Sequence, residues 1–245
     1  MSYVAAVWTN GHAASGNHHG EAYGNLSWKE QLSSDICSGH LNPDGTFTTE
    51  MEHPNKNLVI IRHGESEYNT GITEELDSGL TQKGYCQIET VAFFLRQRLT
   101  GYIGYVSPLL RCLQTARLIR QQTGITFNVI PEISEFTQRY PQEGISVPSR
   151  TESYPEFNWP AIQSQMHFPK EPDFDFLERL KLVFSQISSN SLIITHGSVV
   201  MTLCEIALGL NVHEIPKWDN SIDNASISFV SDGTVLWFGK KVENL

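Results

Sequence analysis

The stretch LVIIRHGESEYN, residues 58–69, is the strongest structural signal in the chain. Its first four residues are all aliphatic, and a short continuous apolar run is typical of a strand buried on both faces of a sheet. The residues that follow at once are polar and begin with Arg62, His63 and Gly64. The stretch therefore predicts a buried strand that ends at an arginine and a histidine.

Working outward from this stretch, strand and helix patterns alternate. Three further apolar runs predict strands, at residues 105–106, 127–130 and 192–194. Segments with helical apolar spacing lie between the runs, and one of these helices is expected to begin after the capping residue Thr81. Residues 227–230 and 235–238 are expected to pair as a hairpin. The alternation predicts an α/β fold, a three-layer α/β/α sandwich with a mostly parallel central sheet.

The chain is expected to have two parts. Residues 1–53 are rich in Gly, Asn, Ser and His, and we interpret them as an N-terminal extension whose function the sequence does not indicate. Residues 54–245 form the predicted domain. Within it, residues 136–172 contain repeated prolines, which exclude a long helix, interleaved with aromatic residues. We expect this segment to form an ordered cap over the site.

Composition restricts the choice of partners. The 245 residues carry a formal net charge of −10, which disfavours binding to nucleic acid or to acidic membranes. The apolar runs are too short to span a bilayer, and the first residues lack the pattern of a secretory signal. We therefore expect a cytoplasmic protein and do not exclude a homodimer. A phosphate ester remains compatible with the charge, because screening confines distant charges to about a Debye length, ~8 Å at physiological salt.

The cysteines predict neither zinc binding nor redox chemistry. Cys37, Cys86, Cys112 and Cys204 are widely spaced and form no C-x-x-C pair. The last three fall within apolar helical patterns, so we expect buried free thiols. The histidines within residues 12–19 are interpreted as part of a polar extension.

Charged and imidazole side chains follow three of the predicted strands. Arg62 and His63 come directly after the first strand. Arg111 comes shortly after the strand near residue 106, and His196 follows the strand at 192–194. Since the carboxyl ends of parallel strands meet at one edge of a sheet, we expect these side chains to share one crevice.

This set of side chains suits phosphoryl transfer. A neutral imidazole nitrogen can attack phosphorus and hold the phosphoryl group covalently. Guanidinium groups match the geometry of phosphoryl oxygens and stay charged at any working pH. The glycines after the two histidines are expected to let the backbone approach the ligand, and a helix N-terminus there adds N–H donors.

Four motifs resemble those of the histidine phosphatase superfamily, which is phosphoglycerate-mutase-like in fold. They are R-H-G-x-[ST]-x-x-N at residues 62–69, D-x-x-L-T at 77–81, S-x-L-x-R-x-x-x-T-A at 107–116 and the second histidine motif at 194–197. The resemblance runs from about residue 57 to 231 and omits the extension. It implies an enzyme that forms phosphohistidine.

The resemblance also implies roles for individual residues. His63 is the implied nucleophile, surrounded by Arg62, Arg111 and His196, which stabilise the charge of the transferring group. His63 is expected to keep one tautomer by donating its other ring N–H to a nearby backbone carbonyl.

Further phosphate contacts are implied for Asn69, Ser66 and Gly197. The resemblance implies no metal and no other cofactor, with a phosphorylated small molecule as substrate.

The general acid is less clearly marked. The family places it after the third strand in a pattern like L-x-E, and here that segment contains both Glu132 and Glu135. Glu135 is the predicted proton donor and Glu132 the alternative.

Several reactions remain open. His196 follows His63 by only 133 positions, whereas the related mutases carry a longer insertion that keeps water from the intermediate. A metal-independent phosphomonoesterase of the phosphatase branch is therefore the preferred hypothesis. A phosphoglycerate-type mutase, a sugar bisphosphatase and a non-enzymatic phosphate-binding protein are the alternatives. In the cap, Arg139, Arg150, Tyr154 and Trp159 are candidates for contacts with the leaving group, and the alternative is that the aromatic residues only anchor the segment.

Overall fold

The computed structural model describes three two-residue strands and four longer segments of the chain, namely residues 40–41, 47–48, 56–136, 145–161, 165–166, 171–210 and 222–245. The chain divides into two compact units, Met1–Cys37 and Ser38–Leu245. The first unit lies outside the described residues, as does the boundary expected near residue 53. The division into an extension and a domain therefore stays a prediction.

A six-stranded sheet forms the centre of the second unit, in the order β10-β9-β3-β8-β4-β5. The strands are β3 (Asn57–Arg62), β4 (Ile103–Val106), β5 (Phe127–Val129), β8 (Ser191–Thr195), β9 (Ile227–Ser231) and β10 (Thr234–Lys240). The pairs β3–β8, β8–β4 and β4–β5 are parallel, and β9 is antiparallel to both β3 and β10. The predicted mostly parallel sheet and the C-terminal hairpin are both confirmed.

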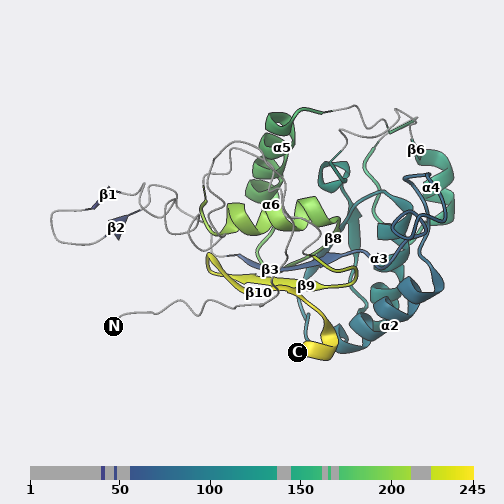
Figure 1. The fold of residues 1–245 in the computed structure, drawn as a ribbon, viewed down its shortest axis with the longest axis horizontal. Coiled ribbons are helices and arrows are strands. Elements are labelled where there is room, and N and C mark those ends of the chain that lie inside the picture. The colour runs from purple at the N-terminus through teal and green to yellow at the C-terminus, as the bar shows by residue number, and fades with distance from the viewer. Residues whose placement is uncertain are drawn as a thin grey trace, which may run out of the picture. The chain divides into compact units, whose positions relative to one another are not determined.

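Helices cover both faces of this sheet (Figure 1). They are α2 (Gln82–Leu95) and α3 (Leu110–Thr123) on one face, and α5 (Asp173–Gln186) and α6 (Gly197–Ala207) on the other. The uniformly apolar β3 shows why: Val59 and Ile61 pack into the core under α2 and α3, while Leu58 and Ile60 pack under α5 and α6. The predicted three-layer sandwich is therefore confirmed.

The start of α2 follows from its capping residue. Thr81 has extended backbone angles, and its Oγ1 accepts a hydrogen bond from Gly84 N at 3.0 Å, as expected of an N-cap. The expectation of a buried thiol on this helix was wrong, because Cys86 faces away from the core and is exposed. Cys112 and Cys204 are buried, as predicted.

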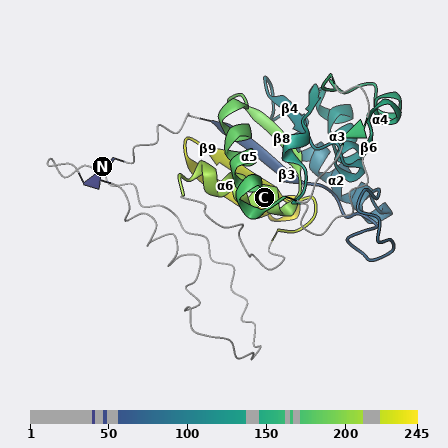
Figure 2. The same cartoon turned by 90° about the horizontal axis from the view of Figure 1, so that it is seen from above.

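The described part of the cap segment contains short elements. A seven-residue helix, α4 (Val147–Ser153), follows β6 (Ile145–Ser146), which pairs with β7 (Gln165–Met166). The elements α4 and β6 lie next to each other in two perpendicular views (Figure 1 and Figure 2). Elsewhere, β1 (His40–Leu41) pairs with β2 (Phe47–Thr48). Short 3-10 helices lie at η2 (Pro131–Ile133) and η3 (Val242–Asn244). Among the described residues, none of the helices combines the length and hydropathy that crossing a membrane requires.

Candidate active site

The end of β3 holds His63 in one orientation and one tautomer. Its side chain is almost fully buried, with an exposed fraction of 1%. Nδ1 lies 2.7 Å from the carbonyl oxygen of Gly64. A carbonyl can only accept, so Nδ1 carries the proton and Nε2 keeps a lone pair. This contact thus requires the tautomer that was expected for His63, with the proton on Nδ1.

The glycine after His63 has a packing role that the sequence did not indicate. A side-chain carbon at Gly64 would lie 2.8 Å from the carbonyl oxygen of Gly84 and 2.9 Å from Ile88 Cγ1. Gly64 is therefore required by the close packing of α2 against the loop after β3. The expectation that its small size also lets the backbone approach a ligand stays a prediction.

Arg111 joins the two histidines. It lies in the first turn of α3, with only 2% of its surface exposed. Its Nε donates to His63 Nε2 at 3.0 Å, and its Nη2 lies 3.1 Å from His196 Nδ1. Nη1 donates to the carbonyl of Leu76, which fixes the guanidinium plane. The two imidazole rings are edge to face, with centroids 5.2 Å apart.

His196 lies at the junction of β8 and α6 and is fully buried. Because Arg111 can only donate, His196 Nδ1 accepts its hydrogen bond, and the ring proton is on Nε2. That nitrogen lies 2.9 Å from Ser107 Oγ and 3.5 Å from Cys112 Sγ. Ser107, which directly follows β4, therefore helps to fix the orientation of the His196 ring through Nε2.

Arg62 presents an unused donor to this cluster. Its Nη1 donates to the carbonyl of Ile222, but its buried Nε has no hydrogen-bond partner. Buried donors are rarely left unpaired, and this nitrogen is available to donate to a bound anion. A side-chain carbon at Gly197 would lie 3.6 Å from the same nitrogen. The first N–H groups of α6, which begins at Gly197, have no intrahelical acceptor and favour an anion there.

The two candidate acids have different surroundings. Glu135 Oε2 lies 3.8 Å from His196 Nδ1, and its side chain is 19% exposed. Glu132 lies in η2 and is exposed. The structure brings Glu135 to the histidines and leaves Glu132 at the surface.

Ser66 and Asn69 hold each other. Ser66 is fully buried, and its hydroxyl donates to Asn69 Oδ1 at 2.9 Å. Asn69 Oδ1 accepts these hydrogen bonds from Ser66, and the amide nitrogen is the only side-chain group of Asn69 that can donate to a phosphate. Direct phosphate contacts by either residue stay predictions.

Sequence reasoning missed Asn224. Its Nδ2 lies 3.2 Å from the carbonyl oxygen of His63, 3.4 Å from that of Gly64 and 3.0 Å from Asn69 Oδ1. It lies just before β9. Because β9 runs antiparallel to β3, its first residues lie beside the last residues of β3. The sequence shows only that a polar residue precedes this strand. Predicting its contact with His63 would have required knowing that the strand runs antiparallel to β3.

The cap residues are held by contacts away from the two histidines. Arg150 forms an ion pair with Asp77, whose Oδ1 accepts from Leu110 N at 2.6 Å at the start of α3. Burial raises the pKa of Asp77, and Arg150 opposes that shift. Trp159 Nε1 donates to the carbonyl of Tyr154 at 3.0 Å. The contact between Trp159 and Tyr154 favours the anchoring alternative for the aromatic residues. A leaving-group contact by Arg150 stays a prediction, and Arg139 lies outside the described residues.

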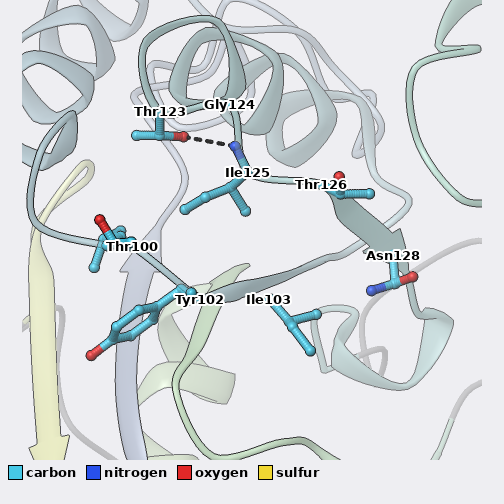
Figure 3. Close-up of a pocket in the computed structure, with 10 residues that line it drawn as sticks. Thr100, Tyr102, Ile103, Thr123, Gly124, Ile125, Thr126 and Asn128 are labelled. Carbon is cyan, nitrogen blue, oxygen red and sulfur yellow. Dashed lines mark hydrogen bonds between the residues drawn. The ribbon is translucent and has the colours of Figure 1, made fainter.

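A hollow of about 530 Å³ lies elsewhere, at the amino ends of β4 and β5 (Figure 3). Figure 3 shows Thr123 accepting a hydrogen bond from Ile125 N, at 3.3 Å, in its wall. Its lining contains no histidine, arginine or carboxylate. The hollow therefore lacks the imidazole and guanidinium groups that the proposed phosphoryl chemistry uses.

The electrostatics of the cluster keep both imidazoles neutral. Burial, followed by the positive charges of Arg111 and Arg62, holds the pKa of His63 well below 6.5. Burial, followed by Arg111, lowers the pKa of His196 in the same way. A neutral imidazole with a free lone pair is the form that attacks phosphorus.

This lowering predicts a pH-dependent stability. Below pH 6.5 the unfolded chain protonates both histidines while the folded chain does not, so the free energy of unfolding should fall as pH falls from 6.5 towards the folded-state pKa values. Each histidine adds about 1.4 kcal/mol per pH unit to the slope. Urea unfolding without phosphate measures how the free energy of unfolding depends on pH. His63→Gln and His196→Gln should each reduce this slope. Equal slopes in all three proteins would contradict the prediction.

The chain is thus an α/β protein whose parallel strands end at a buried cluster of two imidazole and two guanidinium groups. It belongs to the histidine phosphatase superfamily (branch 1), whose family model matches residues 58–237.

Relatives of this chain include a phosphoglycerate mutase and a bifunctional kinase/bisphosphatase. It is 40% identical over 72 residues to a 2,3-bisphosphoglycerate-dependent phosphoglycerate mutase of Bartonella quintana, covering 28% of this chain and 35% of the mutase. It is 27% identical over 169 residues to 6-phosphofructo-2-kinase/fructose-2,6-bisphosphatase 1 of Mus musculus, covering 66% of this chain and 34% of that protein. The matches therefore span about a third of each relative's length.

The fold is similar to that of the ecdysone phosphate phosphatase of Bombix mori, solved in complex with tungstate. The TM-score is 0.59 at 16% identity, over 75% of this chain and 93% of that one. At this identity the likeness supports the fold alone.

Proposed function

We propose that the protein is a metal-independent phosphomonoesterase that works through a phosphohistidine at His63. The observation that carries the proposal is the unpartnered, buried Nε of Arg62 beside two neutral imidazoles and the guanidinium of Arg111. A phosphoryl group is an anion whose oxygens guanidinium groups bind through charge-assisted hydrogen bonds.

The reaction has two steps. His63 Nε2 attacks phosphorus, the bond from phosphorus to the ester oxygen breaks, and Glu135 gives its proton to the leaving oxygen. Water then attacks the phosphorus of the phosphohistidine and gives a proton to Glu135. The bond between phosphorus and His63 Nε2 breaks, which restores the lone pair on Nε2 and releases inorganic phosphate.

Arg111 must change partner during the first step. Its Nε donates to His63 Nε2, the same nitrogen that attacks phosphorus. A lone pair engaged in a hydrogen bond is not available for bond formation, so the guanidinium must turn to the phosphoryl oxygens. It then stabilises the charge of the transition state.

The proposal is tested by phosphate release from p-nitrophenyl phosphate with chelator present. Continuous release, together with an acid-labile phosphoenzyme, supports it. The similarity to a phosphoglycerate mutase makes isomerisation the second candidate. Isomerisation of phosphoglycerate that requires a bisphosphorylated primer, with little net hydrolysis, would replace the phosphatase proposal by the mutase.

Glu135→Gln is expected to lower kcat/KM on an alkyl phosphate by roughly 10²–10⁴-fold, the usual contribution of a positioned general acid. The alkoxide leaving group needs a proton, whereas p-nitrophenolate is stable without one, so the loss on p-nitrophenyl phosphate should be smaller. Glu132→Gln is the matched control, because Glu132 is exposed. A larger loss for Glu132→Gln would reverse the assignment.

A further inference from the structure

Ser198 contacts the proposed general acid from a separate element. It is the second residue of α6, and its hydroxyl donates to Glu135 Oε1. The backbone N–H of Phe136 donates to the same oxygen at 3.2 Å. Both donors therefore act on Oε1, while Oε2 is the oxygen 3.8 Å from His196 Nδ1.

This division distinguishes two oxygens that are equivalent in a free carboxylate. A proton on Oε1 would oppose the two donors that point at it. The proton of the acid therefore belongs on Oε2, the oxygen that faces the histidines. The Phe136 N–H comes from the neighbouring residue and moves with Glu135, so Ser198 is the donor that fixes the carboxylate relative to His196.

The backbone around Glu135 is held independently of Ser198. Arg179 Nη1 donates to the carbonyls of Glu132 at 2.5 Å and Ser134 at 3.2 Å. Thr195 Oγ1 donates to the carbonyl of Ile133 at 2.6 Å. Loss of the Ser198 hydroxyl should therefore release the carboxylate without moving the loop, and alanine is a good helix former.

We propose that Ser198 is a positioning residue that aims Oε2 of Glu135 at the leaving oxygen. The inference rests on the proposed function, because it requires Glu135 to be the proton donor. It adds a residue that none of the sequence motifs includes.

The test measures kcat/KM on ethyl phosphate and on p-nitrophenyl phosphate. For each ester, kcat/KM reports the transfer of the phosphoryl group to His63. Ser198→Ala is expected to lose roughly 10–100-fold on ethyl phosphate, the range for one hydrogen bond to a group that becomes charged as it gives up its proton. The loss on p-nitrophenyl phosphate should be much smaller. Ser198→Thr keeps the hydroxyl and should recover most of the ethyl phosphate rate. Ser185→Ala, an exposed helical serine on α5, is the matched control.

Glu135→Gln in the same two assays separates the two claims. If Glu135→Gln loses equally on both esters, the general-acid assignment fails and the role of Ser198 fails with it. If Glu135→Gln is selective but Ser198→Ala loses equally on both or on neither, the inference about Ser198 is overturned while the proposed function stands. Selective loss in both variants, with rescue by threonine, supports both.

Discussion

Replacing His63 by alanine should abolish turnover and the phosphoenzyme together. The ring is the only proposed site of covalent attachment, and loss of a covalent nucleophile lowers rates by roughly 10⁴-fold or more. The measurements are phosphate release and acid-quenched labelling with a radioactive phosphate ester. Alkali-stable, acid-labile label is expected in the natural protein and none in His63→Ala.

The variant must still fold and bind phosphate for this result to count. Its circular dichroism should match that of the natural protein, and inorganic phosphate should still bind, because Arg62 and Arg111 remain. Normal turnover by a folded His63→Ala protein would remove the covalent mechanism. Label retained at another residue would move the nucleophile.

Arg111→Met should reduce kcat by roughly 10³–10⁵-fold, the range for an arginine that stabilises a phosphoryl transition state. Methionine keeps much of the side-chain volume but removes the donors that reach His63 Nε2 and His196 Nδ1. It also removes a positive charge that lowers the pKa of both histidines. Their pKa values should rise, which NMR titration of the ring protons measures.

Arg117→Met is the matched control for Arg111→Met. Arg117 lies on the same helix but pairs with Glu156 of the cap, with 2.5 Å between Nε and Oε1. Its replacement removes an equal charge at a distance from the two imidazoles, and little change in kcat is expected. Equal losses in the two variants would assign the effect of Arg111 to helix stability or net charge.

Local chemistry fixed much of the fold in advance. The aliphatic run of β3 predicts a doubly buried strand, since each face of the strand must meet apolar neighbours, and Val59 and Leu58 lie in opposite cores. Thr81 predicts a helix start, because its hydroxyl satisfies a free N–H. Arg62, His63, Arg111 and His196 were predicted to meet because parallel strands end at one edge of a sheet. The structure brings all four together.

The tertiary structure decided what depends on strand order and direction. No local pattern places β8 between β3 and β4, yet that order brings His196 within reach of Arg111. Asn224 reaches His63 only because β9 is antiparallel, which puts the beginning of one strand beside the end of another.

Side-chain direction in irregular segments was also beyond the sequence. Glu132 and Glu135 are carboxylates in the same loop, and no periodicity tells which faces the site. The 3-10 turn of η2, held by Arg179, leaves Glu132 exposed, and Ser198 meets Glu135. The sequence by itself thus determined which residues follow each buried strand, because burial and capping are local properties. Only the tertiary structure decided which loop residues orient these side chains, because the contacts join residues that are far apart along the chain.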